Sequence, residues 1–186
     1  MTDTASQYRL FSRVELLPAT RALLSHRIEE EAWLEDPDTN YLMGWGKGHD
    51  GRIRALEYAS QMLDSGDAFA VVACDRPTGW VKIEPVADRE VRLEVFIRPS
   101  KPKPLYPVGP TALVLTLDRL FKGSIYRVEV EIIMPNHRVG RLLRAMGFKE
   151  EGRRFSRRWA GEVVYDTLAF SMTKPMWKKA RRRWRQ

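Results

Sequence analysis

The stretch "YRVEVEIIMPNHRVGRLLRAMGFKEEG", residues 126–152, changes its hydrophobic period once and therefore predicts two elements in succession. Residues 126–134 have the alternating and β-branched character of a strand, whereas residues 137–146 place their apolar side chains on one side of a helix. Asn136 stands where a helix N-cap is expected, and Gly147 follows the last helical residue. We predict a strand, a tight turn and a helix that ends at Gly147.

Upstream of this stretch, the pattern predicts a meander and a buried helix. Three short runs are apolar or alternate between apolar and polar residues, and they are the segments 68–75, 79–87 and 90–99. Short turns separate these runs, which favours antiparallel pairing. Residues 110–123 are apolar nearly all round, with Pro110 in the first turn and Gly123 past the end, and this is typical of a buried helix.

The flanking segments complete the prediction. Helical periodicity occurs at 19–34 and 52–66, and a final strand is expected at 162–173. The Pro-rich and Gly-rich segments 36–51 and 100–110 are predicted to be loops. The strand–helix–strand order from residue 90 onward implies parallel pairing in part of the sheet, through a right-handed crossover.

The net charge of +8 is concentrated at the C-terminal end of the chain. Residues 1–148 contain 20 basic and 20 acidic side chains, whereas residues 149–186 contain 12 basic and 4 acidic ones. Such a basic end favours polyanionic partners. The candidate nucleic-acid-binding cations are Arg153, Arg154, Arg157, Arg158, Lys178, Lys179, Arg181, Arg182 and Arg183.

Two readings of this basic end stay open. Trp177 and Trp184, seven residues apart, would share one helical face, and aromatic residues among cations are typical of sequence-tolerant nucleic-acid binding. Anionic lipid surfaces are a related possibility. The alternative is a solvated tail that only aids solubility.

Cysteine, histidine and signal patterns exclude several classes of protein. The single cysteine, Cys74, is expected in the core of a strand and rules out an intrachain disulfide framework. No secretory signal and no apolar run of membrane-spanning length is present, so a reducing, cytoplasmic location is expected. The three histidines are isolated in the sequence, and we expect no metal site.

The strand, the Asn-capped helix and the Gly-Phe exit together resemble a known pattern. The GNAT superfamily (general-control-type N-acetyltransferases) has the pattern N-x-x-S-x-R-x-x-x-x-x-G-F-x-x-E-G followed by Tyr-Asp, above all in enzymes that acetylate ribosomal-protein N-termini and in their antibiotic-acetylating relatives. The serine of the pattern is Val139 here. The resemblance covers about residues 8–173, and the matching positions are Asn136, Arg141, Gly147, Phe148, Glu151, Gly152, Tyr165 and Asp166.

This resemblance implies an α/β (α+β) fold, with a mixed, mostly antiparallel sheet of six to seven strands and helices on both faces. It also implies that acetyl-CoA or another acyl-CoA lies between two splayed strands. The family's pyrophosphate loop corresponds to "YPVGPT", residues 106–111, in which Pro107 and Pro110 have no N–H to donate. The residues implied for cofactor binding are Phe96, Ile97, Arg98, Lys103, Val108, Gly109, Thr111, Ala112, Asn136, Arg141 and Phe148.

For catalysis, the resemblance implies a general base that deprotonates an amine. Glu94, on the polar face of the strand before the cofactor loop, is the first candidate, and Glu84 on the neighbouring strand is the second. Both could instead be exposed carboxylates that pair with Arg92 or Lys82 across strands. The proton for the leaving sulfur could come from Tyr165, from Tyr126 or from solvent, and the pattern does not choose among them.

Two functions follow from these patterns. The first is acetyl-CoA-dependent N-acetylation of a primary amine, on a protein N-terminus or a small molecule. The second is a GNAT-fold protein that binds or modifies nucleic acid, with acyl-CoA use altered or lost. We expect one domain over residues 1–173, followed by a basic tail over residues 174–186.

Overall fold

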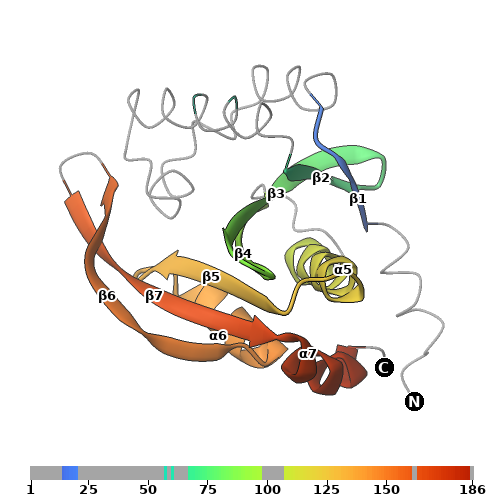
Figure 1. Ribbon diagram of the computed structural model, residues 1–186. Coiled ribbons are helices and arrows are strands. Elements are labelled where there is room, and N and C mark those ends of the chain that lie inside the picture. Colours follow the sequence, from blue (N-terminus) through green and yellow to red (C-terminus); the bar gives the residue numbers. More distant parts are fainter. Residues whose placement is uncertain are drawn as a thin grey trace, which may run out of the picture.

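In the computed structural model, the described residues are 14–20, 57, 60, 67–97, 107–160 and 163–184. They form a seven-stranded sheet in the order β1-β2-β3-β4-β5-β7-β6 (Figure 1). Every neighbouring pair is antiparallel except β4 and β5, which are parallel. The strands are β1 (Val14–Pro18), β2 (Ala68–Ala73), β3 (Arg76–Ala87), β4 (Glu90–Ile97), β5 (Arg127–Ile133), β6 (Lys149–Ala160) and β7 (Val163–Thr173). The helices are α5 (Val108–Lys122), α6 (His137–Met146), α7 (Lys174–Ala180) and the 3-10 turn η1 (Arg181–Trp184).

The predicted meander is present as β2, β3 and β4, but its first turn lies earlier than expected. The turn is formed by Cys74 and Asp75, which both have a left-handed backbone with φ of 50° and 62°. Such a two-residue turn matches the twist of the strands that it joins. The segment "RPTG" (76–79), predicted to be the turn, is the start of β3, and Cys74 is exposed at the turn rather than buried in a strand.

The strand, turn and helix predicted at 126–152 occur as β5 and α6. The side chain of Asn136 accepts a hydrogen bond from Val139 N at 3.3 Å and so caps α6. Gly147 adopts a φ of 91° at the C-cap, which a residue with a Cβ would adopt only with strain. Gly140 brings α6 close to β5, because a Cβ there would lie 3.3 Å from Ile132 Cδ1.

Two strands were not predicted. β1 lies in the N-terminal third, which the sequence pattern indicated as mostly helical. β6 is the arginine-rich segment after α6, and its charge concealed its strand character. β6 and β7 form a hairpin, and β7 lies between β5 and β6 in the sheet, antiparallel to both. The helices predicted at 19–34 and 52–66 lie outside the described residues, apart from the helical Glu57 and Ser60.

One face of the sheet is covered by α5, α6 and α7 (Figure 1). Leu117 of α5, Leu143 of α6 and Trp177 of α7 are all buried in one cluster with the apolar residues of β4, β5 and β7. On the other face, Trp80 and Phe96 stack with ring centroids 4.3 Å apart. The sheet therefore has an apolar face under the described helices and a second face that carries aromatic and charged side chains.

The C-terminal segment, expected as a basic tail, packs against this same cluster. Trp177 is 3% exposed, and its Nε1 donates to Asp118 Oδ1 at 2.9 Å. Ala180 and Trp184 also pack against the cluster. Residues 174–184 therefore form a docked helical element, which differs from the solvated tail considered above.

Candidate active site at the divergence of two strands

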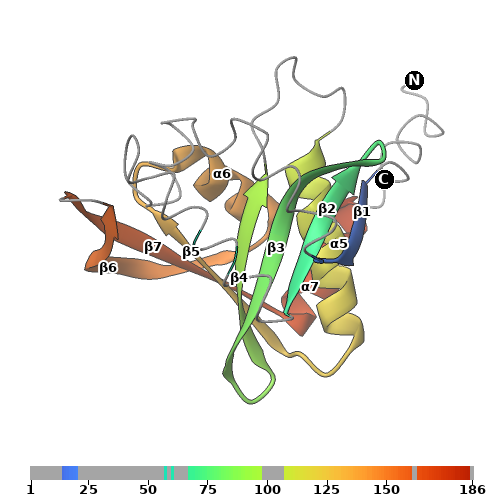
Figure 2. The ribbon, with the colours of Figure 1, turned by 90° about the horizontal axis from the view of Figure 1, so that it is seen from above.

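The site lies where β4 and β5 separate. Their parallel register runs from Glu90↔Arg127 to Leu93↔Val130 and ends there. β4 continues with β3 as far as Ile97, while β5 continues with β7. Figure 2 shows the two strands running apart toward their C-terminal ends. Crevices outside the carboxyl ends of neighbouring parallel strands are the usual ligand sites of α/β sheets.

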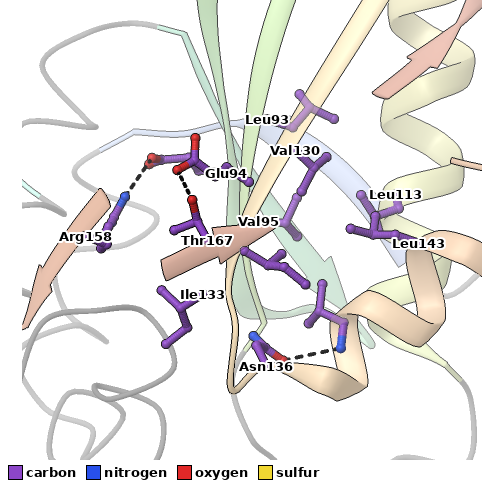
Figure 3. Close-up of a pocket in the computed structure, with 13 residues that line it drawn as sticks. Leu93, Glu94, Val95, Leu113, Val130, Ile133, Asn136, Leu143, Arg158 and Thr167 are labelled. Atoms are coloured by element: carbon purple, nitrogen blue, oxygen red, sulfur yellow. Dashed lines mark hydrogen bonds and ion pairs between the residues drawn. The ribbon is translucent and has the colours of Figure 1, made fainter. Parts of the chain in front are cut away.

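A pocket of about 100 Å³ fills this divergence (Figure 3). Glu94 and Glu131 alternate with the buried core residues of their strands, so they point to the face opposite α5 and α6. The pocket therefore passes between the strands and joins the two faces of the sheet. Its apolar lining is Leu93, Val95, Leu113, Val130, Ile132, Ile133, Val139 and Leu143, and its polar lining is Glu94, Glu131, Asn136, Arg158 and Thr167.

Two helix N-termini lie on the face of the sheet opposite Glu94, and one of them borders the pocket. α6 begins at Asn136, which lines the pocket. α5 begins next to the end of β4, because a Cβ added at Gly109 would lie 3.7 Å from Ile97 Cγ1. Neither helix has an acidic residue in its first turn, and Pro107 gives α5 no side-chain cap. These positive helix ends are suited to an anionic group such as a diphosphate.

On the opposite face, Glu94 is the central ionisable group. Its side chain is 22% exposed, and its Oε1 lies 3.8 Å from Arg158 Nη1. Burial raises the pKa of Glu94 above the ordinary value, Arg158 opposes that rise, and the nearby Glu131 adds to it. A carboxylate with a raised pKa is a stronger base, so Glu94 is suited to accept a proton from an amine.

Glu131 is held by several donors. Arg154 Nη1 donates to its Oε2 at 2.8 Å, and Thr167 Oγ1 donates to its Oε1 at 2.6 Å. Arg157 Nε lies 3.7 Å from the same Oε1. Because its oxygens already accept these strong hydrogen bonds, Glu131 shapes the field around Glu94 rather than acting as a second base.

The other predicted catalytic residues lie elsewhere. Glu84 pairs with Arg92 at 3.6 Å, as the cross-strand alternative predicted, and does not line the pocket. Tyr165 lies on β7 opposite Arg158, two residues before the pocket residue Thr167 in the chain. It does not line the pocket either. Of the three catalytic candidates, the structure places Glu94 in the pocket.

The predicted cofactor residues divide into three groups. Asn136 lines the pocket, and Gly109 and Ile97 lie together at the entrance of α5. Arg141 is exposed on α6, and Arg98 and Lys103 lie outside the described residues. The remaining five are buried side chains that do not line the pocket, namely Phe96, Val108, Thr111, Ala112 and Phe148.

Three site residues were not assigned to catalysis from the sequence. In the sequence, Glu131 was only a polar position of an alternating strand. The parallel register ends at Leu93 and Val130, so Glu94 and Glu131 occupy equivalent positions, each one residue past that end. Arg158 was assigned to nucleic acid because it lies in a run of cations. Its approach to Glu94 depends on the pairing of β6 with β7, which the sequence pattern did not predict. Thr167 carried no sequence signal beyond its place in a strand.

Two further observations concern other kinds of site. Among residues that the structure describes, no three His, Cys, Asp or Glu side chains gather closely enough to hold a metal ion. None of the described helices is long and apolar enough to cross a membrane.

The chain was compared with known families, curated proteins and solved structures. No family profile and no curated protein matches it. Solved structures match over most of its length, among them a GCN5-related N-acetyltransferase from Brucella melitensis, with a TM-score of 0.74, 17% identity, and coverage of 92% of this chain and 80% of that chain.

Two other similar structures contain coenzyme A. Spermidine N-acetyltransferase from Vibrio cholerae, in complex with CoA and spermine, matches with a TM-score of 0.70 and 14% identity, covering 90% of this chain and 99% of that one. RimL, the ribosomal L7/L12 alpha-N-protein acetyltransferase, in complex with coenzyme A, matches with a TM-score of 0.67 and 10% identity, covering 87% and 94%. The chain therefore has the fold of the GNAT acetyltransferases.

Proposed function

We propose that the protein is an N-acetyltransferase that takes an acyl group from acetyl-CoA, or another acyl-CoA, and transfers it to a primary amine. The observation that carries this proposal is the pocket between β4 and β5, which is lined by Asn136 at the start of α6 on one face and by Glu94 on the other. Donor and acceptor can therefore approach each other from opposite faces. Enzymes of this fold with bound coenzyme A add support.

The donor side fits a nucleotide thioester in its chemistry. The amides of Val108 and Gly109 open α5, and we propose that they hold the diphosphate. Arg98 and Lys103, which precede α5 in the sequence, are candidates to neutralise its charge. Asn136 and the apolar lining would hold the pantetheine arm. Pro110 removes one donor from this turn, so fewer amides serve the diphosphate than in the family pattern.

The chain's own contribution to the reaction is orientation and one proton transfer. Bound acyl-CoA supplies a thioester: the amine nitrogen bonds to the acyl carbon, the carbon–sulfur bond breaks, and the thiolate takes a proton from solvent. Glu94 accepts the proton that the attacking amine loses. The apolar walls exclude water from the thioester and so limit its hydrolysis.

Calorimetric titration with acetyl-CoA, followed by turnover with a panel of amines, tests this proposal. We expect micromolar binding, and we expect Glu94→Gln to lower kcat about 10²- to 10⁴-fold with little change in acetyl-CoA affinity. Glu84→Gln is the matched control, because Glu84 lies on the same face but outside the pocket. Absence of acetyl-CoA binding, or equal turnover in both variants, would refute the assignment.

We infer a second function, polyanion binding by α7 and η1, from how basic and acidic residues are distributed along the C-terminal part of the chain. Between residues 153 and 158 the arginines face carboxylates: Arg153 bonds to Asp166, Arg154 to Glu131, and Arg158 lies near Glu94. In contrast, residues 174–186 contain no acidic residue. Among the described residues of this segment, 174–184, the exposed cations are Lys178, Lys179, Arg182 and Arg183.

The packing of α7 favours nucleic acid over a lipid surface. Membrane-surface helices insert an apolar face, but Trp177, Ala180 and Trp184 pack against the protein core. Trp177 is too deeply buried to stack on bases. The remaining interaction is attraction to phosphates, which is independent of sequence and sensitive to salt.

Fluorescence anisotropy with a short RNA duplex at several salt concentrations tests this second function. Each phosphate contact contributes about −0.9 to the slope of log affinity against log salt. We expect the double variant Lys178→Gln/Lys179→Gln to make that slope less steep by nearly the contribution of two phosphate contacts. The control Arg76→Gln/Lys122→Gln removes two exposed cations elsewhere and should leave the slope unchanged. Equal slopes in the two double variants would exclude this surface.

A further inference from the structure

Thr167 places a buried hydroxyl on the wall of the pocket. It lies on β7, where it pairs with Ile133 of β5 on one side and with Arg154 of β6 on the other, and it is 1% exposed. It lines the pocket together with Glu94, and Figure 3 shows its hydroxyl directed toward the side on which Glu94 lies. Because a strand residue that is paired on both sides has a fixed position, this hydroxyl is in place before any ligand binds.

The preceding residue, Asp166, makes this part of β7 more rigid. Residues 155–157 of β6 form a bulge opposite Asp166, and Ser156 N donates to Asp166 Oδ1 at 2.7 Å. On the other side, Met134 N donates to the Asp166 carbonyl at 2.9 Å. Bulges beside active sites commonly re-aim side chains. Asp166 therefore ties β7 both to the bulge and to the chain that leaves β5, directly beside Thr167.

The hydrogen of the Thr167 hydroxyl is committed to Glu131. Thr167 Oγ1 donates to Glu131 Oε1 at 2.6 Å, and Arg154 Nη1 donates to Glu131 Oε2 at 2.8 Å. The arginine favours the ionised carboxylate, and an ionised carboxylate only accepts hydrogen bonds. The ion pair on one oxygen therefore fixes Thr167 as the donor to the other.

The Thr167 oxygen still has its capacity to accept. A hydroxyl oxygen has two lone pairs, and none of the residues that the structure describes donates a hydrogen bond to Thr167 Oγ1. Since its hydrogen is already used, this hydroxyl can only accept from a ligand in the pocket. It therefore distinguishes a ligand group that presents a hydrogen at this point from one that presents a methyl group.

We propose that Thr167 is a specificity-determining residue: its Oγ1 accepts one N–H of the attacking amine while Glu94 takes the proton of another, so that the site selects primary over secondary amines. This inference rests on the proposed acetyltransferase function. The nitrogen lone pair forms the bond to the acyl carbon, the carbon–sulfur bond breaks with its electron pair left on sulfur, and one proton passes to Glu94. The other N–H, held by Thr167, stays in the amide product.

A secondary amine cannot make both contacts. After the attack, the nitrogen of a primary amine carries two hydrogens, whereas the nitrogen of a secondary amine carries one. If that one hydrogen goes to Glu94, an alkyl group faces Thr167 Oγ1, and a buried acceptor lacks its donor. A site that hydrogen-bonds a substrate N–H rejects an analogue without it more strongly than shape alone can.

Amines paired with their N-methyl derivatives test the proposal. The probes are benzylamine, alaninamide and the fastest primary amine of the panel, each compared with the derivative methylated at the amine nitrogen. The ratio of kcat/KM is expressed per deprotonated amine, because methylation changes the amine pKa. We expect wild type to prefer the primary amine more than tenfold. Thr167→Val keeps the shape without the hydroxyl and should lower this preference about tenfold, the worth of one hydrogen bond, by slowing the primary amine.

Three further variants separate contact with the amine from a structural role. Thr167→Ser keeps the hydroxyl and should keep the preference. Arg154→Gln loosens Glu131 but leaves the hydroxyl, so the preference should persist even if kcat falls. Thr116→Val removes another buried hydroxyl, which donates to Ala112 O at 2.8 Å within α5, and should change nothing. A loss of preference in Arg154→Gln as large as that in Thr167→Val would assign the effect to Glu131 and overturn the proposal.

The outcomes also separate this proposal from the proposed function. If acetyl-CoA does not bind, or no amine is acetylated, the acetyltransferase assignment fails and the Thr167 proposal fails with it. If primary amines react but their N-methyl derivatives react as fast, or if Thr167→Val keeps the full preference, only the Thr167 proposal is overturned. The first of these comparisons needs wild type alone, so it decides the matter even if Thr167→Val does not fold.

Discussion

Glu94 and Arg158 form the pair on which the chemistry of the pocket depends. Burial favours the neutral form of Glu94, while Arg158 at 3.8 Å favours the carboxylate. The outcome is a pKa for Glu94 that lies above the ordinary carboxyl value. Burial therefore raises the pKa of the group that takes the proton, and the contact with Arg158 limits that rise.

The pH profile follows from this contact. We expect kcat/KM to fall as the pH drops through the raised pKa of Glu94, because the protonated carboxyl cannot act as a base. Arg158→Gln removes the charge that lowers this pKa, so the acidic limb should move to higher pH. Comparing the variant with wild type on one acceptor cancels the ionisation of the amine itself. An acidic limb that stays in place, or moves to lower pH, would show that the two residues are not coupled.

At the scale of elements, two segments rich in basic residues have different roles in the fold. β6 places its arginines against carboxylates on the charged face of the sheet, while α7 buries its apolar side and leaves its cations exposed. β6 pairs with β7 inside the sheet, next to strands that carry carboxylates, whereas Trp177, Ala180 and Trp184 recur at helical spacing and form the buried side of the C-terminal helix. The partners of each basic residue follow from the element that carries it.

The docking of α7 should contribute substantially to stability. Trp177 is 3% exposed and also bonds to Asp118, so Trp177→Ala should lower the free energy of unfolding by about 3–5 kcal/mol. Trp177→Phe keeps most of the packing and loses the hydrogen bond, and should cost about 1 kcal/mol or somewhat more. Urea denaturation followed by circular dichroism measures both. An alanine variant as stable as wild type would mean that α7 does not dock in solution.

The β6 bulge makes a prediction about local order. Asp166→Asn weakens the acceptor for Ser156 N, so amide exchange at Ser156 should accelerate, while exchange at Val130 in β5 stays slow. Hydrogen exchange resolved by residue measures both amides in one experiment. Unchanged exchange at Ser156 would show that the bulge is held by other contacts.

Across the whole molecule, ion pairs run over the charged face of the sheet from β3 to β6. Glu84 pairs with Arg92, Arg92 with Glu129, and Arg127 with both Glu129 and Glu151. These contacts connect strands that belong to the two halves of the divided sheet. They hold β4 and β5 together below the point at which the strands separate.

This network predicts acid sensitivity. The hydrogen bond from Arg127 lowers the pKa of Glu151; burial opposes ionisation of Glu129, but Arg127 and its neighbours hold that pKa below the ordinary value as well. Carboxyls with a lowered pKa stabilise the fold above their unfolded pKa, and that contribution is lost as the pH falls. We expect Tm to fall below pH about 4, the ordinary carboxyl range. Arg127→Gln should flatten this dependence, and an equally steep loss in that variant would assign it to other groups.

Much of the fold was predictable because local patterns specify its elements. Asn136 and Gly147 delimited α6 at its observed ends, and the alternation at 79–87 and 90–99 identified two strands. β6 was missed because "RRFSRRW" (153–159) has few apolar residues on either face and is stabilised by ion pairs with neighbouring strands instead. Periodicity cannot detect a strand of that kind.

The candidate site was predicted less completely. Glu94 was identified from its place on a polar strand face, and the structure places it in the pocket. Glu84 has the same local pattern but lies with Arg92. Two equivalent carboxylates in the sequence thus acquire different surroundings, because only one of them stands where β4 leaves β5.

The sequence by itself determined which segments become strands and helices at the centre of the chain, since capping residues and hydrophobic period act over a few neighbouring positions. Only the tertiary structure decided which carboxylate faces the pocket, which arginines are neutralised and which remain exposed, and that the C-terminal helix docks. Those properties depend on register and on contacts such as Glu131 with Arg154, between residues far apart in the chain. Local composition cannot encode distances that arise only when the sheet assembles.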